Sequence, residues 1–566
     1  MGLASGFIRV GKDGLGGPFN SCWRGRAGRP VELKMIAPSA REPRSIEHCM
    51  QTSHQTPDTL LGWLVGGLTL VGVITGWTTL FADSSVRPHV ILVMADDMGW
   101  GQTGYRNHPV LKTPHLDAMA ANGLRFERFY AGGPVCSPTR ASVLTGRSHD
   151  RAGVLSHGYA LRLQEKTIAQ ALKQAGYVTG HFGKWHLNGF RGPGAPVLAG
   201  DRYRPSQFGF DEWVSVSNFF DLNPLMSRQG KIEPLEGDSS EIAVRQAVDF
   251  LQRHHAEQKP MFAVIWFGSP HSPFKAQESD LASFTKLNNA SANHYAELVA
   301  LDRSVGRLRQ SLRELQIDQN TLLVFCSDNG GLPEIEPDTV GGLRGNKGTL
   351  YEGGIRVPGI IEWPAAIRPR ITSYPACVMD LFPTLCDLVG LPADAMLDPI
   401  DGISLRPLFA QELATRSAPI GFRYQKKRAL IDHRYKLLVD DLTSGQFQLF
   451  DLVNDPQESR DLREQEPARY AEMKQRLIDW NASVDRSFAG QDYPEREVTP
   501  PDPPPINWFE SPDYAPYLSA WQERWEYRSY LNRSPRDTKS AKTKTEKAKR
   551  NRSKTGPIGN GPGSNE

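Results

Sequence analysis

The sequence predicts an α/β protein in which helices flank a mostly parallel β-sheet and a smaller α+β subdomain follows toward the C-terminus. Between residues 86 and 400, short β-branched runs alternate with amphipathic segments, which is the pattern of parallel strands covered by helices. The clearest apolar runs end in clusters of polar residues, as expected where ligands bind at the carboxyl edge of such a sheet. After residue 402 the strands become shorter and a polar helix follows.

Composition excludes several classes of protein. The 566-residue chain carries 66 Lys and Arg against 63 Asp and Glu, a net charge of +3. This small charge gives no reason to expect a nucleic-acid partner. A hydrophobic fraction of 39% allows a chain of this length to bury a sizeable core, so it is not wholly disordered. Six irregularly spaced cysteines predict neither a disulfide framework nor a CxxC zinc site.

The N-terminal region predicts export. Residues 1–59 are basic and aperiodic, which indicates a disordered leader, and residues 60–82 contain no charged side chain. That stretch exceeds the roughly 20 apolar residues that cross a bilayer. It is either a transmembrane anchor or an export signal cleaved near Ala82. In both interpretations the rest of the chain is exported to a periplasmic or other extracytoplasmic location, either anchored to the membrane or secreted.

The catalytic part is expected within residues 86–400. Strands are predicted at residues 89–95, 177–182, 261–267 and 321–326, and helices at residues 114–122, 167–175, 241–254 and 294–315. The apolar spacing of CVMDLFPTLCDLVG predicts a further helix that contains both Cys377 and Cys386. A helical rise of about 1.5 Å per residue would keep these two cysteines too far apart for a disulfide.

Three regions are expected after residue 400. Residues 401–495 should form the smaller subdomain, with strands at 435–439 and 446–450 and a helix at 467–480. Residues 496–533 are rich in proline and aromatic residues and predict an extended segment. Residues 534–566 form a basic tail that is too polar to fold alone. Adhesion of this tail to an acidic polymer or a membrane is the alternative to a solvated disordered segment.

Two polar pairs follow predicted strands and suggest a metal site. Asp96 and Asp97 come after the first strand, and Asp328 and Asn329 come after the strand at 321–326. Adjacent carboxylates repel one another, so two such pairs facing each other would form an oxygen-rich site for a hard divalent cation. Ca²⁺ or Mg²⁺ fits such a site, whereas Zn²⁺ prefers nitrogen and sulfur ligands. On this pattern alone, ordinary helix-capping or turn aspartates remain the alternative.

Cationic and imidazole side chains follow the other strands. Lys184 and His186 come after one strand, His271 comes after another, and Lys347 lies in the glycine-rich segment LRGNKGTLYEGGIRVP. A lysine can neutralise an oxyanion, and a histidine can protonate a leaving oxygen near neutral pH. Glycines allow the backbone to approach a ligand closely. Ordinary loop positions are the alternative for each of these residues.

The segment GGPVCSPTRASVLTGR, residues 132–147, carries the strongest signal. Cys136 stands just before Pro138, a residue favoured at the start of a helix, and Arg140 would lie one turn further on. A helix N-terminus stabilises an anion through its free amides and its dipole. A plain buried thiol and a cysteine hydrolase with a Cys–His pair are the alternatives. The second gives no reason for the carboxylate cluster.

At these motifs the chain resembles the sulfatase family, whose signature is CxPxR followed by LTGR. Here the signature reads CSPTR at residues 136–140 and LTGR at residues 144–147. Further segments that match are ADDMGWG, GKWHLN, SPHSPF, SDNGG and LFDLVNDPQESRDL, so the resemblance spans residues 88–480. It implies an alkaline-phosphatase-like fold and hydrolysis of aryl or carbohydrate sulfate monoesters. Thr139 departs from the Ser or Ala usual at that position, which could slow maturation.

The resemblance also implies the cofactors. Cys136 would be oxidised to formylglycine by a separate maturation enzyme. One hydroxyl of the hydrated aldehyde would attack the ester sulfur and expel the alcohol or phenol, and the other would then expel sulfate and regenerate the aldehyde. A Ca²⁺ ion, with Mg²⁺ as the second choice, would be held by the matured Cys136 together with Asp96, Asp97, Asp328 and Asn329.

The remaining roles are implied in the same way. Arg140 and His186 would orient and stabilise the hydrate, and Lys184 and Lys347 would neutralise sulfate oxygens. His271 would protonate or stabilise the leaving oxygen.

The substrate would be a sulfated small molecule or a sulfated glycan, and the loops at residues 190–203, 219–236 and 333–342 are expected to shape its pocket. Two alternatives remain at this point. One is a phosphonate or phosphate ester hydrolase of the same superfamily, and the other is a catalytically silent protein that binds sulfated glycans.

Overall fold

The computed structural model of the chain describes residues 87–532. The predictions made for residues 1–59, 60–82 and 534–566 therefore lie outside the described residues. Among the helices between residues 87 and 532, none has the length and apolar character needed to cross a bilayer.

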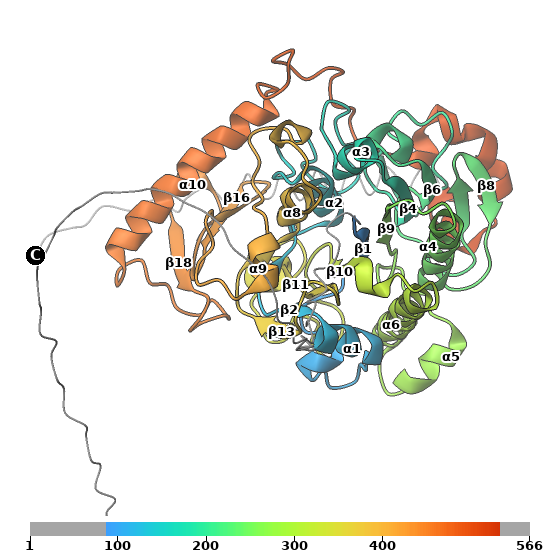
Figure 1. Ribbon diagram of the computed structural model, residues 1–566, viewed down its shortest axis with the longest axis horizontal. Coiled ribbons are helices and arrows are strands. Elements are labelled where there is room, and N and C mark those ends of the chain that lie inside the picture. Colours follow the sequence, from blue (N-terminus) through green and yellow to red (C-terminus); the bar gives the residue numbers. More distant parts are fainter. Residues whose placement is uncertain (1–86, 533–566) are drawn as a thin grey trace, which may run out of the picture. The chain divides into compact units, whose positions relative to one another are not determined.

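A ten-stranded mixed sheet forms the centre of the described chain (Figure 1). Its five consecutive central strands, from β10 to β6 in the order below, are parallel, whereas the pairs β10–β12, β12–β2, β6–β7 and β7–β8 are antiparallel. From one edge to the other the strands are β13 (Arg370–Thr372), β2 (Leu124–Phe126), β12 (Gly359–Glu362), β10 (Thr321–Ser327), β1 (His89–Ala95), β9 (Met261–Trp266), β4 (Val178–Lys184), β6 (Glu212–Val216), β7 (Leu225–Arg228) and β8 (Lys231–Pro234). The predicted α/β fold class is confirmed.

Helices cover both faces of this sheet. One face carries α2 (Cys136–Thr145), α3 (Ile168–Gln174) and α8 (Leu381–Val389), and the other carries α1 (Pro114–Asn122), α4 (Ser239–His255) and α6 (Asn289–Glu314) (Figure 1). Along β1, Val90 and Leu92 join the first core, while Ile91 and Val93 join the second. Successive strand residues point to opposite faces, so a strand covered on both sides must be apolar throughout. This explains the uninterrupted run HVILVMA.

The predicted strands and helices of the catalytic part agree with the structure to within a few residues. The four predicted strands correspond to β1, β4, β9 and β10, and the four predicted helices to α1, α3, α4 and α6. The remaining elements of this part are β3 (Phe129–Tyr130), β11 (Arg356–Val357), β14 (Ala376–Cys377), α5 (Glu278–Leu281), α7 (Glu352–Ile355) and α9 (Arg406–Ala410). The four cysteines of the described chain, Cys136, Cys326, Cys377 and Cys386, are free and buried.

The prediction that one helix contains both Cys377 and Cys386 is wrong. Cys377 ends strand β14, where it pairs with Tyr130, and α8 begins only at Leu381. The cause is Asp380, whose carboxylate accepts a hydrogen bond from the Cys377 amide at 2.8 Å and so caps the helical turn that follows. Arg416 holds this carboxylate in place at 2.7 Å. The apolar spacing does not reveal this polar capping interaction or the distant arginine that supports it.

A second sheet follows the catalytic part. It contains β15 (Ile420–Tyr424), β16 (Lys427–Asp432), β17 (Tyr435–Val439) and β18 (Phe447–Asp451), all antiparallel, and α10 (Pro467–Phe488) packs across it through an apolar cluster. Lys436 of β17 is fully buried between Glu352, at 3.1 Å, and Glu458, at 2.9 Å. Removing one partner of such a buried group costs about 3–5 kcal/mol. The ion pairs therefore fasten this sheet to the segment that carries Lys347, and the domain boundary at residue 400 stays a prediction.

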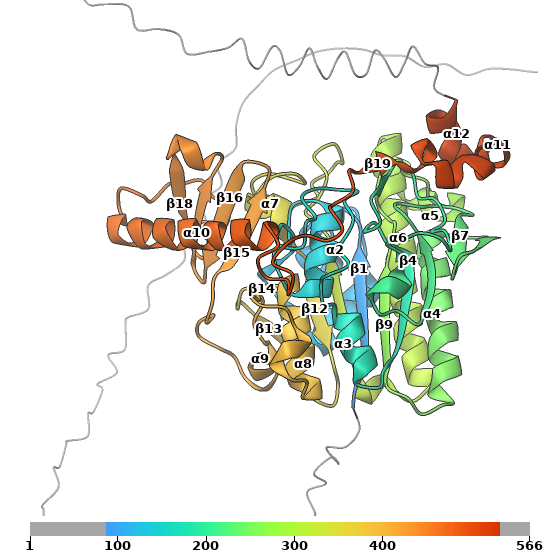
Figure 2. The same ribbon diagram turned by 90° about the horizontal axis from the view of Figure 1, so that it is seen from above.

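Residues 496–532, which we call the C-terminal arm, pack against the segment after β5 (Phe190–Arg191). The arm is extended up to β19 (Ile506–Asn507), which pairs with β5 in parallel, and then forms short helices that include α11 (Leu518–Trp521) and α12 (Trp525–Leu531). Three buried aromatic side chains donate hydrogen bonds to backbone carbonyls of residues 193–196 at 2.8–2.9 Å, namely Trp508, Tyr514 and Tyr527. Figure 2 shows the arm at the edge of the sheet where β1 and β4 end.

The buried indole of Trp508 should be the main anchor of the arm. Trp508 is 0% exposed, whereas Trp525, in the same arm, is 42% exposed. Trp508→Ala should therefore cost about 3–5 kcal/mol of the free energy that holds the arm in place. Trp525→Ala, as the matched control, should change it by about 0.5 kcal/mol or less. Hydrogen exchange of the amides of residues 506–531 measures both effects, and equal losses of protection would contradict the assignment.

Candidate active site

The polar residues predicted to act together converge at the carboxyl edge of the central sheet. The strands that supply them are neighbours in the order β10, β1, β9 and β4. Asp328 and Asn329 come from β10, Asp96 and Asp97 from β1, His271 from β9, and Lys184 and His186 from β4. Cys136 is the first residue of α2 and reaches the same edge. The parallel arrangement explains why residues so far apart in the sequence meet.

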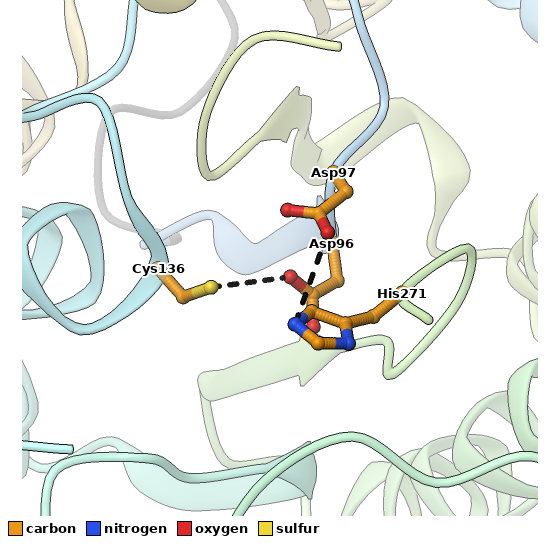
Figure 3. A group of neighbouring side chains, drawn as sticks. All are labelled: Asp96, Asp97, Cys136 and His271. Carbon is orange, nitrogen blue, oxygen red and sulfur yellow. Dashed lines mark hydrogen bonds and ion pairs between the residues drawn. The ribbon is translucent and has the colours of Figure 1, made fainter. Parts of the chain in front are cut away.

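Four potential ligand groups lie at the centre of this site (Figure 3). One donor atom each from Asp96, Asp97, Cys136 and His271 lies within 4.8 Å of all the others. The Cys136 Sγ is 3.5 Å from Asp96 Oδ1, and His271 Nε2 is 3.8 Å from Asp97 Oδ2. Such a cluster of donors can hold a metal ion.

Asp328 and Asn329 extend this cluster. The Asp97 amide donates to Asp328 Oδ1 at 3.2 Å, and the Asn329 side-chain amide donates to Asp97 Oδ1 at 2.8 Å. The carbonyl oxygen Oδ1 of Asn329 is buried and has no hydrogen-bond partner among the described residues. A buried acceptor without a donor is unusual and costly. A hard cation would satisfy it.

Each buried carboxylate of the site faces at least one cation, and Asp96 also lies 3.9 Å from Arg140. Asp328 lies 2.7 Å from Arg140, Asp97 lies 2.7 Å from Lys347, and Asp96 forms an ion pair with Lys184. All six groups are buried except Lys347, whose side chain is 21% exposed. Burying a charge without its partner is expensive, so each pair depends on both of its members.

Burial makes the Cys136 thiol a weak nucleophile. It raises the pKa of the thiol to about 12, and the positive charges of Lys184 and Lys347 oppose this only in part. The thiol is therefore protonated at neutral pH, whereas attack requires the thiolate. Among the described residues, the hydrogen-bond partner of Sγ is a carboxylate and not a histidine. The geometry thus does not favour the Cys–His hydrolase considered from the sequence.

The neighbouring acids and His271 respond to burial in different ways. Burial, with Asp96 beside it, raises the pKa of Asp328 to about 6 although Arg140 opposes the shift. Burial also acts on Asp97, but the charges of Lys347 and His271 outweigh it and lower the pKa of Asp97 below its ordinary value. Burial and then the charge of Lys347 lower the pKa of His271 to about 3. His271 is therefore neutral in the free site, and its Nδ1 donates to the Ser272 carbonyl.

Two site residues adopt a backbone conformation that costs about 1–2 kcal/mol for a residue other than glycine. The φ angles of Asp97 and His186 are 66° and 54°. Hydrogen bonds stabilise both conformations: Asp328 and Asn329 hold Asp97, and the hydroxyl of Ser137 donates to the His186 carbonyl at 2.7 Å. Both ring nitrogens of His186 are buried and lack a hydrogen-bond partner among the described residues. His186 therefore lies at the site without a direct bond to the carboxylate cluster.

Sequence reasoning missed two residues that position the site. Ser137 was part of the motif but received no role, and it links α2 to the backbone at His186, just after β4. Phe219 stacks on the imidazole of His271, with ring centroids 4.6 Å apart and an interplanar angle of 7°. The only signal for Phe219 was its place in a loop expected to shape the pocket. The catalytic and metal-binding roles assigned from the sequence stay predictions.

The fold and this site define a hydrolase of the alkaline-phosphatase-like type, with an acidic centre beneath the N-terminus of a helix. The family model Sulfatase matches residues 88–391, and the model described as N-sulphoglucosamine sulphohydrolase, C-terminal, matches residues 345–483. The chain belongs to the sulfatase family, and it is a sulfuric ester hydrolase.

Individual relatives agree with this assignment. N-acetylgalactosamine-6-sulfatase of Canis lupus familiaris is 32% identical over 58% of this chain and 70% of its own length. Arylsulfatase A of Homo sapiens is 33% identical over 59% of this chain and 69% of its own length. The crystal structure of Ps i-CgsB superposes with a TM-score of 0.63 at 26% identity, covering 70% of this chain and 92% of that chain. The resemblance stated from the motifs is confirmed.

Proposed function

We propose that this sulfatase hydrolyses carbohydrate or aryl sulfate monoesters with a formylglycine at position 136 and a divalent metal ion, Ca²⁺ in the first place and Mg²⁺ in the second. The observation that carries the proposal is the convergence of Asp96, Asp97, Cys136 and His271 within 4.8 Å. A carbohydrate substrate is supported by a relative named for N-acetylgalactosamine 6-sulfate and by a matching model named for N-sulphoglucosamine.

The residues present fit a hard cation. The donors are carboxylate and amide oxygens of Asp96, Asp97, Asp328 and Asn329, and the last has an unsatisfied buried oxygen. Three carboxylates and three cationic side chains balance one another in this site. A divalent ion bound there would leave the site positively charged, and it would withdraw electron density from the sulfate group. Both effects suit an anionic ester.

Cys136 is well placed for conversion to formylglycine. It is the first residue of α2, where the backbone amides are not used within the helix. Thr139, which differs from the usual Ser or Ala, is fully buried, and its hydroxyl donates to the Gly133 carbonyl at 3.1 Å, so the folded site accommodates it. The matured residue would supply an aldehyde hydrate. One of its hydroxyls would displace the alcohol from the ester sulfur, and the other would then expel sulfate and regenerate the aldehyde.

The surrounding side chains can orient this group and the ester. Arg140 is held rigidly because it donates to the Lys184 carbonyl at 3.0 Å and to Asp328 at 2.7 Å. His186, with two unsatisfied buried ring nitrogens, can bind a hydroxyl at position 136. Lys184 and Lys347 would neutralise sulfate oxygens. His271 would act on the leaving oxygen, since its Nε2 faces the centre of the site.

Export is a further part of the proposal. The uncharged stretch at residues 60–82 supports either a retained anchor, with the membrane as a partner, or a cleaved signal. The catalytic part would lie outside the cytoplasm in both cases. N-terminal sequencing combined with membrane fractionation distinguishes the two, and a cytoplasmic protein with residues 1–82 intact would contradict both.

Protein made with a competent maturation system should carry formylglycine at position 136. Peptide mass analysis detects the modification, and Cys136→Ala should lower turnover of a sulfate monoester by about 10⁴-fold or more, the scale of losing a nucleophile. Cys386→Ala, another buried thiol, is the matched control and should retain activity. Full activity with an unmodified thiol would exclude the mechanism. A higher kcat/KM for the corresponding phosphonate monoester would favour the alternative hydrolase.

Chelation should abolish activity, and Ca²⁺ or Mg²⁺ should restore it better than Zn²⁺, because the proposed ligands are mostly oxygens. Asn329→Ala should weaken binding of Ca²⁺ by at least about tenfold, as measured by calorimetric titration. Asn320→Ala removes the same side chain at the opposite end of β10 and should not change the affinity. Turnover that survives chelation would contradict the metal assignment.

If His271 assists departure of the leaving oxygen, its loss should matter most for poor leaving groups. His271→Ala should reduce kcat by about 10²- to 10⁴-fold on an alkyl or sugar sulfate and much less on a nitrophenyl sulfate. Lys347→Ala removes a charge that acts on the sulfate itself, so its effect should vary little with the alcohol. The slopes of log kcat against leaving-group pKa compare the two variants, and equal slopes would show that His271 only binds sulfate.

A further inference from the structure

A surface with one cation, Arg191, lies at the loop before α3 and at strand β5. We call it the rim patch and define it by His157, Tyr159 and Arg191. We propose that Arg191, with His157 beside it, binds a second anionic group of the substrate, a sulfate or a carboxylate close to the sulfate that is hydrolysed. This inference rests on the proposed function, because it takes the substrate to be a carbohydrate with more than one anionic group.

A single hydrogen bond connects the loop that carries the rim patch to the motif that contains Cys136. The amide of Gly158 donates to the hydroxyl of Ser137 at 2.9 Å, and Ser137 directly follows Cys136. Arg191 Nε donates to the carbonyl of His157, the residue before Gly158, at 3.3 Å. The guanidinium is therefore fixed to the loop that contacts the residue beside the nucleophile. A group bound by Arg191 would lie next to the sulfate binding site.

Electrostatics agree with this position. The His157 side chain is exposed, and where it contacts the protein, desolvation lowers its pKa. The positive charges of Arg191, Lys347 and Lys184 lower the pKa of His157 further, and all these effects together bring it to about 4. The imidazole is neutral at pH 7 and can donate or accept a hydrogen bond, while Arg191 supplies the charge.

Arg191 is held in position before any ligand binds. Gly158 has a φ of +76°, and a Cβ atom there would lie 2.4 Å from Arg191 Cγ, so the side-chain stem packs directly on this glycine. The guanidinium also lies 6.0 Å from the ring centre of Tyr159. The backbone of Arg191 pairs with Asn507 of the C-terminal arm. A side chain fixed in this way loses little entropy when it binds.

Arg191 differs from nearby arginines in its ion pairing. Between residues 87 and 532, no carboxylate forms an ion pair with it, although two arginines of the preceding segments do have such partners: Arg147 pairs with Glu165 and Arg162 with Asp502. The hydrogen bond to His157 uses only Nε. A guanidinium with unused terminal nitrogens binds the planar edge of a carboxylate or sulfate through two parallel hydrogen bonds.

The opposite face of β5 carries a different set of charges. Phe190, the neighbour of Arg191, points the other way and contacts the ring of Tyr514 at 5.4 Å. It lines a cavity of about 490 Å³ whose wall contains the carboxylates of Asp201 and Asp513 beside Arg202. Two acids outnumber the one arginine in this wall, which disfavours a second anionic group there. The second anionic group is therefore expected on the Arg191 side.

The test compares substrates that differ in one anionic group. They are N-acetylgalactosamine 6-sulfate, the 4,6-disulfate of the same sugar, and a disaccharide in which the 6-sulfated sugar is linked to a uronic acid. Arg191→Gln should lower kcat/KM for the disulfate, the uronate or both by about 10- to 100-fold relative to the monosulfate, mainly through KM. The substrate whose kcat/KM falls identifies the second group as sulfate or carboxylate. Arg191→Lys should recover only part of the preference.

Arg202→Gln is the matched control. It removes the same charge from an exposed arginine eleven positions along the chain and should leave the substrate preference unchanged. An equal loss of preference in Arg202→Gln, or an equal effect of Arg191→Gln on all three substrates, would overturn the proposal for Arg191 and leave the proposed function intact. Failure of the unaltered, matured enzyme to hydrolyse any sulfate ester would instead contradict the proposed function itself.

Discussion

The structure depends on charge balance at the carboxyl edge of the central sheet. Three buried carboxylates face three cations there, and the six groups come from the ends of β1, β10 and β4, from α2, and from the segment before α7. A buried charge that loses its partner costs about 3–5 kcal/mol. The site can therefore form only when these segments are all in place. The parallel strands β10, β1 and β4 all end at this edge of the sheet, which brings their charged residues together.

Close backbone packing and support from the second sheet maintain this balance. A Cβ atom on Gly330 would lie 1.9 Å from the Gly353 carbonyl, so the turn after β10 and the segment after Lys347 touch backbone to backbone. Only glycine permits this approach. Lys436, buried between Glu352 and Glu458, secures the same segment from the second sheet. The second sheet thus contributes to the position of Lys347 even though it supplies none of the proposed catalytic groups.

The sequence predicted those features that follow from local pattern and parallel topology. The apolar runs at β1, β9 and β10 identified buried strands, and the polar residues after them had to meet because parallel strands end at one edge. Interactions between distant segments were not predictable. Ser137 bonds to a carbonyl 49 positions away, and Phe219 stacks on a histidine from another loop. The helical part of the C-terminal arm escaped prediction for the same reason. Its proline-rich sequence indicates extended chain, whereas its aromatic side chains bond to residues 193–196, more than 300 positions away.

The C-terminal arm and the six charged side chains at the carboxyl edge of the sheet, the charged centre, differ in how many substitutions they can accept. Neither matching family model reaches the arm, since the matches end at residues 391 and 483. The charged centre tolerates little change, because each substitution leaves a buried charge without its partner. Among the described residues, Arg191 belongs to no such pair, and its backbone is paired with the arm through β19. If Arg191 has the proposed role, its replacement would alter what the enzyme recognises without disturbing the charge balance at the strand ends. The two proposals together assign chemistry to the centre of the sheet and substrate preference to a rim that contacts the C-terminal arm.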